Sequence, residues 1–377
     1  MSFLGKRTYS AGNRYESKRG SYVQEEKETS EESIRQIGMQ KEPLKCQEIQ
    51  KLVEDLKQDV NTRKNIIICT IIECMSTTRF KAPVYSTLVG LLNQIDEDFG
   101  SDFVESLVIS LQDAIEDCNP KMVTNLFVGL SDLVNVNVVQ CSSVLSLLEL
   151  FISSAMDSQS TLYTEWLLRN VLYTLPFVAQ TFENNRLCKE AFAKLMTSIA
   201  SLVKNRKNDY TKALRTWVKS DTFLQSEYLD LLYTSTLSLR KHKWETFAID
   251  RPYENIKETF THSNNHKFTI SKFSTNFLTN KFTLPCVYFQ LFEEMECQDL
   301  KICNQFLPSF ESFERFYISQ QVIDIIEAHD ELKGAFLIKS MVPDSDYNVP
   351  YIIVESIINR ILFFNDFSGA HIKYFVL

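Results

Sequence analysis

Tyr85-Ser86-Thr87-Leu88-Val89-Gly90-Leu91-Leu92-Asn93 is a largely apolar stretch, and Pro83 stands just before it. Proline suits the first position of a helix, because its missing N–H would have no partner there. We therefore predict a helix that begins near Pro83 and runs through Ile95.

Similar patterns extend from this stretch in both directions. Before it, apolar residues from Leu44 to Val60 recur at steps of three and four, which places them on one helical face. The segment from Ile66 to Met75 is apolar nearly all round, which predicts burial on most sides. After the stretch, Asn119 and Pro120 form a helix start signal, with Leu130 on the inward face. Further helices are predicted over residues 103–115, 144–152, 161–182, 187–203, 223–239, 319–331 and 352–363, and the helix over 161–182 is expected to be bent or broken near Pro176.

The composition agrees with an all-α protein. Only 9 of the 377 residues are glycine, far below the roughly 7% of an average chain. So few turn formers favour long helices with short links, and they argue against glycine-rich phosphate loops and dinucleotide folds. The predicted helices arrive in pairs of about 40 residues, the period of HEAT-like α-solenoids. We predict an α-solenoid of antiparallel helix pairs.

The N-terminal segment differs in charge from the rest. Residues 1–20 carry five basic residues and one acidic residue, and residues 21–33 carry five acidic residues and one basic residue. Such a segment buries too little apolar surface to offset its ordering entropy, so residues 1–29 are predicted to form a disordered tail. Within it, Lys6-Arg7 and Lys18-Arg19 have the spacing of a bipartite nuclear-import signal. The second pair lacks further basic neighbours, so the alternative is a merely soluble tail.

The net charge of the chain is −8, so the chain as a whole is not expected to bind polyanions. Two further groups of basic residues nevertheless stand out. They are Lys204, Arg206, Lys207, Lys212 and Arg215, and then Arg240, Lys241 and Lys243. A phosphate-contacting ridge is one interpretation. We favour solvated helix ends, where cations interact well with the helix dipole.

The sequence gives no indication of a metal or catalytic site. His262 and His266 are four apart and Cys297 and Cys303 six apart, without the tight Cys-x-x-Cys spacing of structural zinc sites, and no other cofactor is expected. No P-loop, nucleophile elbow or zincin motif is present. Asp96-Glu97-Asp98 is interpreted as a solvated loop rather than an acid–base pair. We therefore expect a protein that is not an enzyme.

Other residue types are expected to serve the core. Trp166, Trp217 and Trp244 are interpreted as core anchors rather than base-stacking platforms. The nine cysteines lie among apolar residues, as Cys69 and Cys74 do, and are expected to be buried, reduced thiols. The sequence has no signal peptide and no apolar segment long enough to span a membrane, so no membrane association is expected.

Beyond these patterns, the order and spacing of several strings resemble one family, the large subunit of the nuclear cap-binding complex. The resemblance runs from about residue 30 to 362, and each string is short, but the colinear set is specific. Phe177 stands where the family has Trp in Leu-Pro-Trp-Val, and Phe313 stands where it has Val in Ser-Val-Glu-Arg-Phe. The matching strings are Tyr85–Asn93, Phe99–Glu105, Leu130–Asn135, Leu175–Val178, Glu227–Asp230, Trp244, Arg251–Tyr253, Ser312–Phe316 and Ile353–Glu355.

The resemblance implies an MIF4G domain over residues 30–250, followed over residues 251–377 by a connector and the start of a truncated second helical domain. It also implies a nuclear, non-catalytic scaffold that shuttles to the cytoplasm. Its partners would be a small cap-binding subunit with an RNA-recognition fold, capped RNA held through that subunit, an importin-type adaptor, and export and processing factors. The protein-partner surface cannot be assigned from the sequence. The alternative is an MIF4G-type adaptor that binds a DEAD-box helicase in translation or decay.

One departure from the family concerns length. Family members continue through two further helical domains, which hold most of the docking surface for the small subunit, and the end of this sequence, Phe367 to Leu377, matches nothing in the family. A truncated gene model, a splice form or a fragment is therefore expected.

Overall fold

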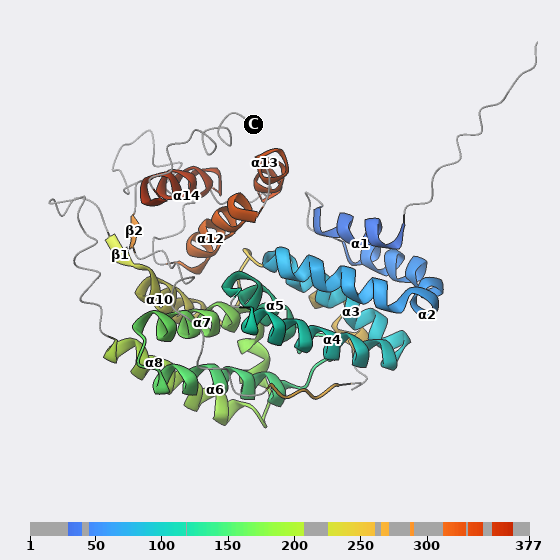
Figure 1. Ribbon diagram of the computed structural model, residues 1–377, viewed down its shortest axis with the longest axis horizontal. Helices are drawn as coiled ribbons and strands as arrows, with labels where there is room; N and C mark the ends of the chain where they lie inside the picture. Colours follow the sequence, from blue (N-terminus) through green and yellow to red (C-terminus); the bar gives the residue numbers. More distant parts are fainter. Residues whose placement is uncertain are drawn as a thin grey trace, which may run out of the picture.

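The computed structural model of the protein describes residues 29–39, 45–117, 119–206, 225–260, 265–270, 287–289, 312–328, 331–341 and 349–364, and most of these described residues lie in helices (Figure 1). Successive helices pack side by side, α2 against α3 and α5, α4 against α5, and α6 against α7 and α8. The α-solenoid predicted from the sequence is confirmed. The first part of the chain comprises α1 (Ser30–Met39), α2 (Cys46–Thr77), η1 (Arg79–Lys81), α3 (Ala82–Ile95), α4 (Glu97–Glu116), α5 (Pro120–Asp132), α6 (Cys141–Asp157), α7 (Thr161–Asn184), α8 (Lys189–Asn205) and α10 (Tyr228–Lys241).

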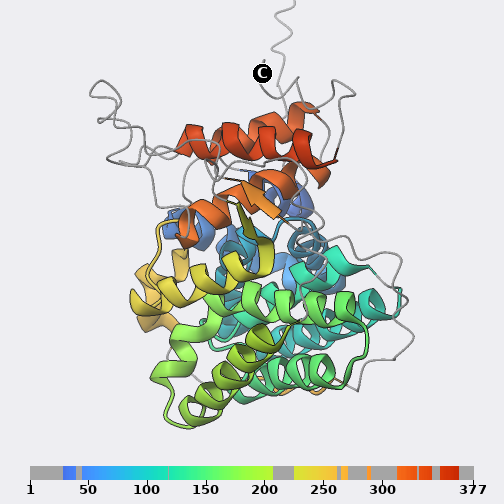
Figure 2. The same ribbon diagram turned by 90° about the vertical axis from the view of Figure 1, so that its left-hand side faces the viewer.

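The later elements contact different parts of this stack. A 3-10 segment, η2 (Pro252–Phe260), packs on α3, and α12 (Phe313–Ala328) contacts α10, α13 (Glu331–Ser340) and α14 (Val349–Phe364). Figure 2 shows α12–α14, in orange and red, as a group above the green and yellow helices. Two short strands, β1 (Gln225–Glu227) and β2 (Val287–Phe289), pair antiparallel with Ser226 opposite Tyr288, an addition to the all-α prediction.

Helix α3 lies at the centre of the core. All its residues from Ala82 to Asn93 are buried, and Pro83 stands in its first turn as predicted. A Cβ atom on Gly90 would lie 2.7 Å from Cβ of Val136 and 2.9 Å from Cε1 of Phe260. Glycine at this position therefore lets the segment after α5 and the end of η2 approach the α3 backbone closely.

Helix starts follow the expected capping chemistry, with one correction. Asn119 caps α5, since its side chain accepts a 3.2 Å hydrogen bond from the N–H of Met122. The interpretation of Asp96-Glu97-Asp98 as a loop is wrong. Asp96 is the N-cap of α4 and accepts from the N–H of Asp98, while Glu97 and Asp98 lie in its first turn, where negative charge is favourable.

Two predictions of helix extent are corrected. Helix α7 runs unbroken through Pro176, where burial of the surrounding turns offsets the hydrogen bond that proline cannot donate. Helix α8 begins at Lys189, and Leu187 before it is 92% exposed. Helix α1, which the apolar periodicity did not predict, begins at Ser30, because Glu31 and Glu32 suit its first turn and Ile34 is fully buried.

Helix α2 is one long helix with a kink at Arg63, and it only partly fits the predicted burial. Ile67, Ile68 and Ile71 are buried as expected. Ile66 is 45% exposed and Cys69 is also exposed, because both lie on the solvent face of the helix. Cys69 therefore contradicts the expectation of buried thiols.

A second, smaller apolar core holds α12–α14 together. Its buried members include Val322 and Ile325 of α12, Leu337 of α13 and Ile352 of α14. Phe313, Phe316 and Tyr317, at the start of α12, belong to the main core instead. Helix α12 is thus shared between the two cores. No helix in the part of the chain described here combines the length and apolarity needed to cross a membrane.

Candidate interaction site

The start of α12 meets the solenoid through aromatic rings. The ring centroids of Phe316 and Tyr228 lie 5.4 Å apart, those of Phe316 and Tyr173 6.2 Å, and those of Tyr317 and Phe177 6.0 Å. Such tilted pairs each contribute about 0.5–1.5 kcal/mol beyond the area that they bury. The rings join α7 and α10 to α12.

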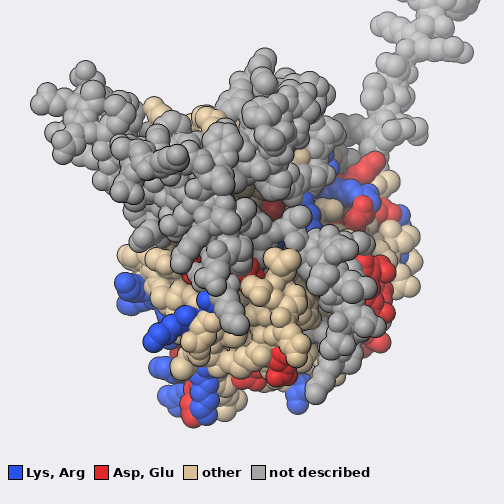
Figure 3. Space-filling model, turned by 60° about the vertical axis from the view of Figure 1, so that its left-hand side comes forward, with Lys and Arg blue, Asp and Glu red and all other residues tan. Residues whose placement is uncertain are grey.

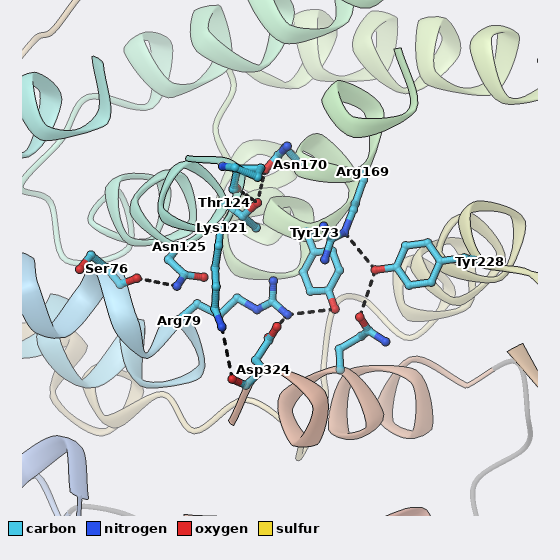
Figure 4. Close-up of polar contacts among 12 residues, drawn as sticks. Ser76, Arg79, Lys121, Thr124, Asn125, Arg169, Asn170, Tyr173, Tyr228 and Asp324 are labelled. Atoms are coloured by element: carbon cyan, nitrogen blue, oxygen red, sulfur yellow. Dashed lines mark hydrogen bonds and ion pairs between the residues drawn. The ribbon is translucent and has the colours of Figure 1, made fainter. Parts of the chain in front are cut away.

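Next to these rings lies a buried ion pair. The Arg79 side chain of η1 is 4% exposed, pairs with the carboxylate of Asp324 on α12, and donates a 3.2 Å hydrogen bond to the hydroxyl of Tyr173 (Figure 4). Its guanidinium also lies 4.1 Å from the centroid of the Tyr173 ring. Burial lowers the pKa of Arg79, but Asp324 and the nearby tyrosines offset this, so the pKa lies above its ordinary value. Arg79 is therefore a permanent cation at this joint.

A second set of contacts extends the cluster along α12. Nε of Arg169 donates to the hydroxyl of Tyr228 at 3.1 Å (Figure 4). That hydroxyl in turn donates to the side chain of Gln320 at 3.2 Å. Lys121 of α5 reaches the backbone carbonyl of Asp324 at 3.4 Å. We call Arg79, Lys121, Arg169, Tyr173, Tyr228, Gln320 and Asp324 the α12 joint. Its groups are arranged to hold two helical units together.

A second buried network joins α5, α7 and η2. The Asp132 carboxylate accepts from the hydroxyl of Tyr253 at 3.0 Å and from the side chain of Asn135 at 2.9 Å. The same amide of Asn135 donates to the carbonyl of Phe177 at 2.7 Å, and Arg251 donates to the carbonyl of Pro176 at 2.9 Å. Burial raises the pKa of Asp132 to about 6.

These contacts explain the strings that carry the family resemblance. Leu130–Asn135, Leu175–Val178 and Arg251–Tyr253 meet in the network around Asp132. The string Ser312–Phe316 meets Ile353–Glu355 through Arg315, which pairs with Glu355 at 2.6 Å. Side chains distant in sequence therefore hold the fold together, and their spacing alone did not show which of them would meet.

The basic residues singled out in the sequence differ in exposure and in ion pairing. The interpretation of Arg206 as a solvated or phosphate-contacting residue is wrong, because its side chain is 3% exposed and pairs with Glu227 and Asp230, each at 2.6 Å. Arg240 pairs with Glu183 at 2.8 Å, while Lys204, Lys241 and Lys243 are exposed. Figure 3 shows basic side chains gathered toward the lower left of one face. Lys207, Lys212 and Arg215 lie outside the described residues.

The remaining candidates are structural where they are described. Trp166 and Trp244 are buried at 2% and 1% exposure, as expected of core anchors. Nε2 of His266 lies 3.0 Å from Oδ1 of Asn93 at the end of α3. Within the described residues, no group of three or more His, Cys, Asp or Glu side chains is placed to hold a metal ion. Outside the described residues lie Trp217, His262, Cys297, Cys303 and the predicted import signal, Lys6, Arg7, Lys18 and Arg19.

Comparison with known protein families agrees with this architecture. The MIF4G domain matches residues 42–243, more than half of the chain. The chain belongs to the MIF4G domain family. In the structure, the MIF4G match extends from the start of α2 to the turn after α10, so α12–α14 lie beyond it.

Individual relatives extend the match past the MIF4G domain. The chain is 28% identical over 344 residues to a protein of Anopheles gambiae named nuclear cap-binding protein subunit 1, a match that covers 90% of this chain. It is 28% identical over 313 residues to the protein of that name from Aedes aegypti, covering 83% of this chain. The chain spans about two fifths of the length of these relatives, 42% and 38% respectively.

Proposed function

We propose that this chain is the N-terminal helical part of a nuclear cap-binding large subunit and acts as a non-catalytic scaffold. It would support a small subunit that holds the 7-methylguanosine cap of RNA. It would also present helical surface to splicing, export, decay and small-RNA processing factors. Its place of action would be the nucleus, with shuttling to the cytoplasm.

The observation that carries this proposal is the extent of the likeness. An alignment of 344 residues cannot fit within residues 42–243, so it continues beyond the MIF4G domain. A helicase-binding MIF4G adaptor needs to share only that domain. The likeness beyond it therefore favours the cap-binding subunit.

The geometry supports a scaffold rather than a direct cap binder. A cap base is held by stacking on exposed aromatic rings, and Trp166 and Trp244 are both buried in the core. The α12 joint and the Asp132 network consist of groups whose partners lie within the chain. Trp166 and Trp244 are therefore not cap-stacking rings, and because the resemblance places the cap in the small subunit, we assign no cap-contacting residue to this chain.

The nuclear location in this proposal rests on the relatives' name and on the sequence of the N-terminal segment. We propose Lys6, Arg7, Lys18 and Arg19 as the import signal, read by the acidic grooves of an importin-type adaptor. Replacing the four residues by alanine should shift a fluorescent fusion from nucleus to cytoplasm. Nuclear fluorescence equal to that of the unmodified fusion would contradict the assignment of these four residues as the import signal.

The test offers both classes of partner to the purified chain in separate titration calorimetry experiments. One is the small cap-binding subunit and the other is an initiation-type DEAD-box helicase. The proposal predicts heat of binding with the small subunit only, and weak affinity, because the resemblance places most of the docking surface in later domains. Binding to the helicase alone, or to neither protein, would contradict the proposal.

A further inference from the structure

The outer face of α4 is unusually acidic. From Ala82 to Pro120 the sequence contains no Lys, Arg or His. In α4, residues at steps of three and four form one exposed stripe about 27 Å long. We call it the α4 stripe, and its members are Asp98, Asp102, Glu105, Ile109, Asp113 and Glu116.

This arrangement is unfavourable for the helix itself. Like charges three or four residues apart, such as Asp98 and Asp102, destabilise a helix by about 0.2–0.5 kcal/mol a pair, and the ion pair of Asp102 with Lys64 at 2.6 Å offsets only part of this repulsion. Asp113 and Glu116 lie in the C-terminal part of α4, where the helix dipole disfavours negative charge. In the middle of the α4 stripe, Ile109 is 49% exposed. A cationic partner with an apolar side chain would relieve both the repulsion and this exposure.

The N-terminal segment of the chain is both cationic and partly apolar. Residues 1–20 have a net charge of +4, and Phe3, Leu4, Tyr9 and Tyr15 are interspersed among the basic residues. The positive charge of this segment is complementary to the carboxylates of the α4 stripe, and its apolar side chains are complementary to the exposed Ile109.

The described structure also places the attachment point of this segment close to the stripe. Ser30, the first residue of α1, bonds to Asp59 of α2, and Glu31 pairs with Arg63 at 2.6 Å. The next residue, Lys64, pairs with Asp102 of the α4 stripe at 2.6 Å. Residues 20–29 join Arg19 to Ser30, and ten residues can span at most about 33–36 Å. The basic segment can therefore reach the stripe.

We propose that residues 1–20 dock on the α4 stripe of the same chain. The tether makes this an intramolecular encounter, with an effective concentration on the order of millimolar. Exposed ion pairs are individually weak and screened by salt, so the docking depends on ionic strength. The docked segment covers Lys6-Arg7 and Lys18-Arg19, so docking competes with any acidic protein that binds them. This inference does not depend on the proposed function.

The first experiment maps contacts in the intact chain with a zero-length carboxyl–amine cross-linker at low salt. The proposal predicts cross-links from Lys6 or Lys18 to carboxylates of the α4 stripe, at a yield independent of protein concentration. Cross-links confined to Glu25, Glu26 and Glu28 would overturn it, since the segment would then pair with its own neighbours. Cross-links that form only between two chains would overturn it as well.

The second experiment measures how fast trypsin cleaves after the basic residues of the segment. In the stripe variant, five carboxylates are neutralised as Asp98→Asn, Asp102→Asn, Glu105→Gln, Asp113→Asn and Glu116→Gln. A matched control neutralises five exposed carboxylates elsewhere, Glu149→Gln, Asp157→Asn, Glu190→Gln, Glu245→Gln and Glu258→Gln.

The stripe variant should be cleaved at least about threefold faster than the wild type and the control in 20–50 mM salt, and the difference should vanish near 0.5 M salt. Equal rates in all three proteins at low salt would overturn the proposal. If circular dichroism shows that the stripe variant is unfolded, the cross-link map of the wild type alone tests whether residues 1–20 dock on the α4 stripe.

Discussion

Arg79 and Asp324 form an ion pair across 245 positions of the chain. Through it, a short turn between α2 and α3 holds a helix that lies beyond the MIF4G match. The surrounding rings of Tyr173, Tyr228 and Phe316 complete the same contact. The MIF4G solenoid and α12 are therefore joined by both charge and packing, and we expect them to unfold together.

The first prediction concerns this pair. Asp324→Ala should lower the free energy of unfolding by about 3 kcal/mol, because it leaves the Arg79 guanidinium buried without its carboxylate. The double variant Arg79→Met, Asp324→Leu should lose much less, since neither charge then remains. Urea denaturation of the wild type, of the single variants Arg79→Met and Asp324→Leu, and of the double variant completes the cycle and measures the coupling. Strictly additive effects would mean that the pair does not act as a unit.

A second prediction concerns Asp132, whose pKa burial raises to about 6 from an ordinary value of 3.8. Between these values the folded chain binds more protons than the unfolded chain, so the contribution of Asp132 to stability falls as pH rises from about 4 to 6. Asp132→Asn removes this titration. The stability of that variant relative to the wild type should therefore rise over this interval, by up to about 3 kcal/mol.

Measuring both proteins by urea denaturation at several pH values isolates Asp132, because the other carboxylates are common to both. A difference that stays constant between pH 4 and 6 would show that Asp132 titrates normally.

The third prediction tests the register of α5. Leu130 is fully buried, so Leu130→Ala should cost about 2–5 kcal/mol through lost burial and the cavity that it leaves. Ile109→Ala, on the exposed face of α4, is the control and should change stability by no more than about 0.5 kcal/mol. Thermal melts followed by circular dichroism compare the two variants. A melting temperature that does not fall with Leu130→Ala would contradict the packing of α5.

The fourth prediction compares two helical glycines. Gly90→Ala places a methyl group 2.7 Å from Val136, so overpacking should outweigh the gain in helix propensity, with a net loss of about 1–2 kcal/mol. At Gly129 the new methyl would meet the flexible Met75 side chain at 3.1 Å. Gly129→Ala should be neutral or stabilising. Denaturant midpoints that move together for both variants would contradict the close approach at α3.

The sequence predicts much of this fold, because apolar periodicity reports which face of a helix is buried. The helix α5 shows this, with its cap at Asn119 and its buried residue Leu130 both as expected. Periodicity does not report partners, so the contact between Asp132 and Tyr253 could not be derived from it. The sequence likewise gave no signal that Arg206 pairs inside the protein, because its neighbours Lys204 and Lys207 are also basic.

Two helices were missed for identifiable reasons. Helix α13 contains Gly334, which lowers helix propensity, and it is held by the burial of Leu337 in the small apolar core that α12–α14 share. Helix α1 is only ten residues long and acidic, and such a helix is marginal in isolation. Its packing against α2 and the ion pair between Glu31 and Arg63 stabilise it. In both cases tertiary contacts outweigh local preference.

The most direct test of the proposed function is retention of the protein on a cap-analogue resin from an extract of the cells that produce it. The account predicts that the protein is retained, that free cap analogue elutes it, and that depleting the small cap-binding subunit abolishes retention. Failure to bind the resin, or retention that persists without the small subunit, would contradict the assignment of this chain as a scaffold in a cap-binding complex.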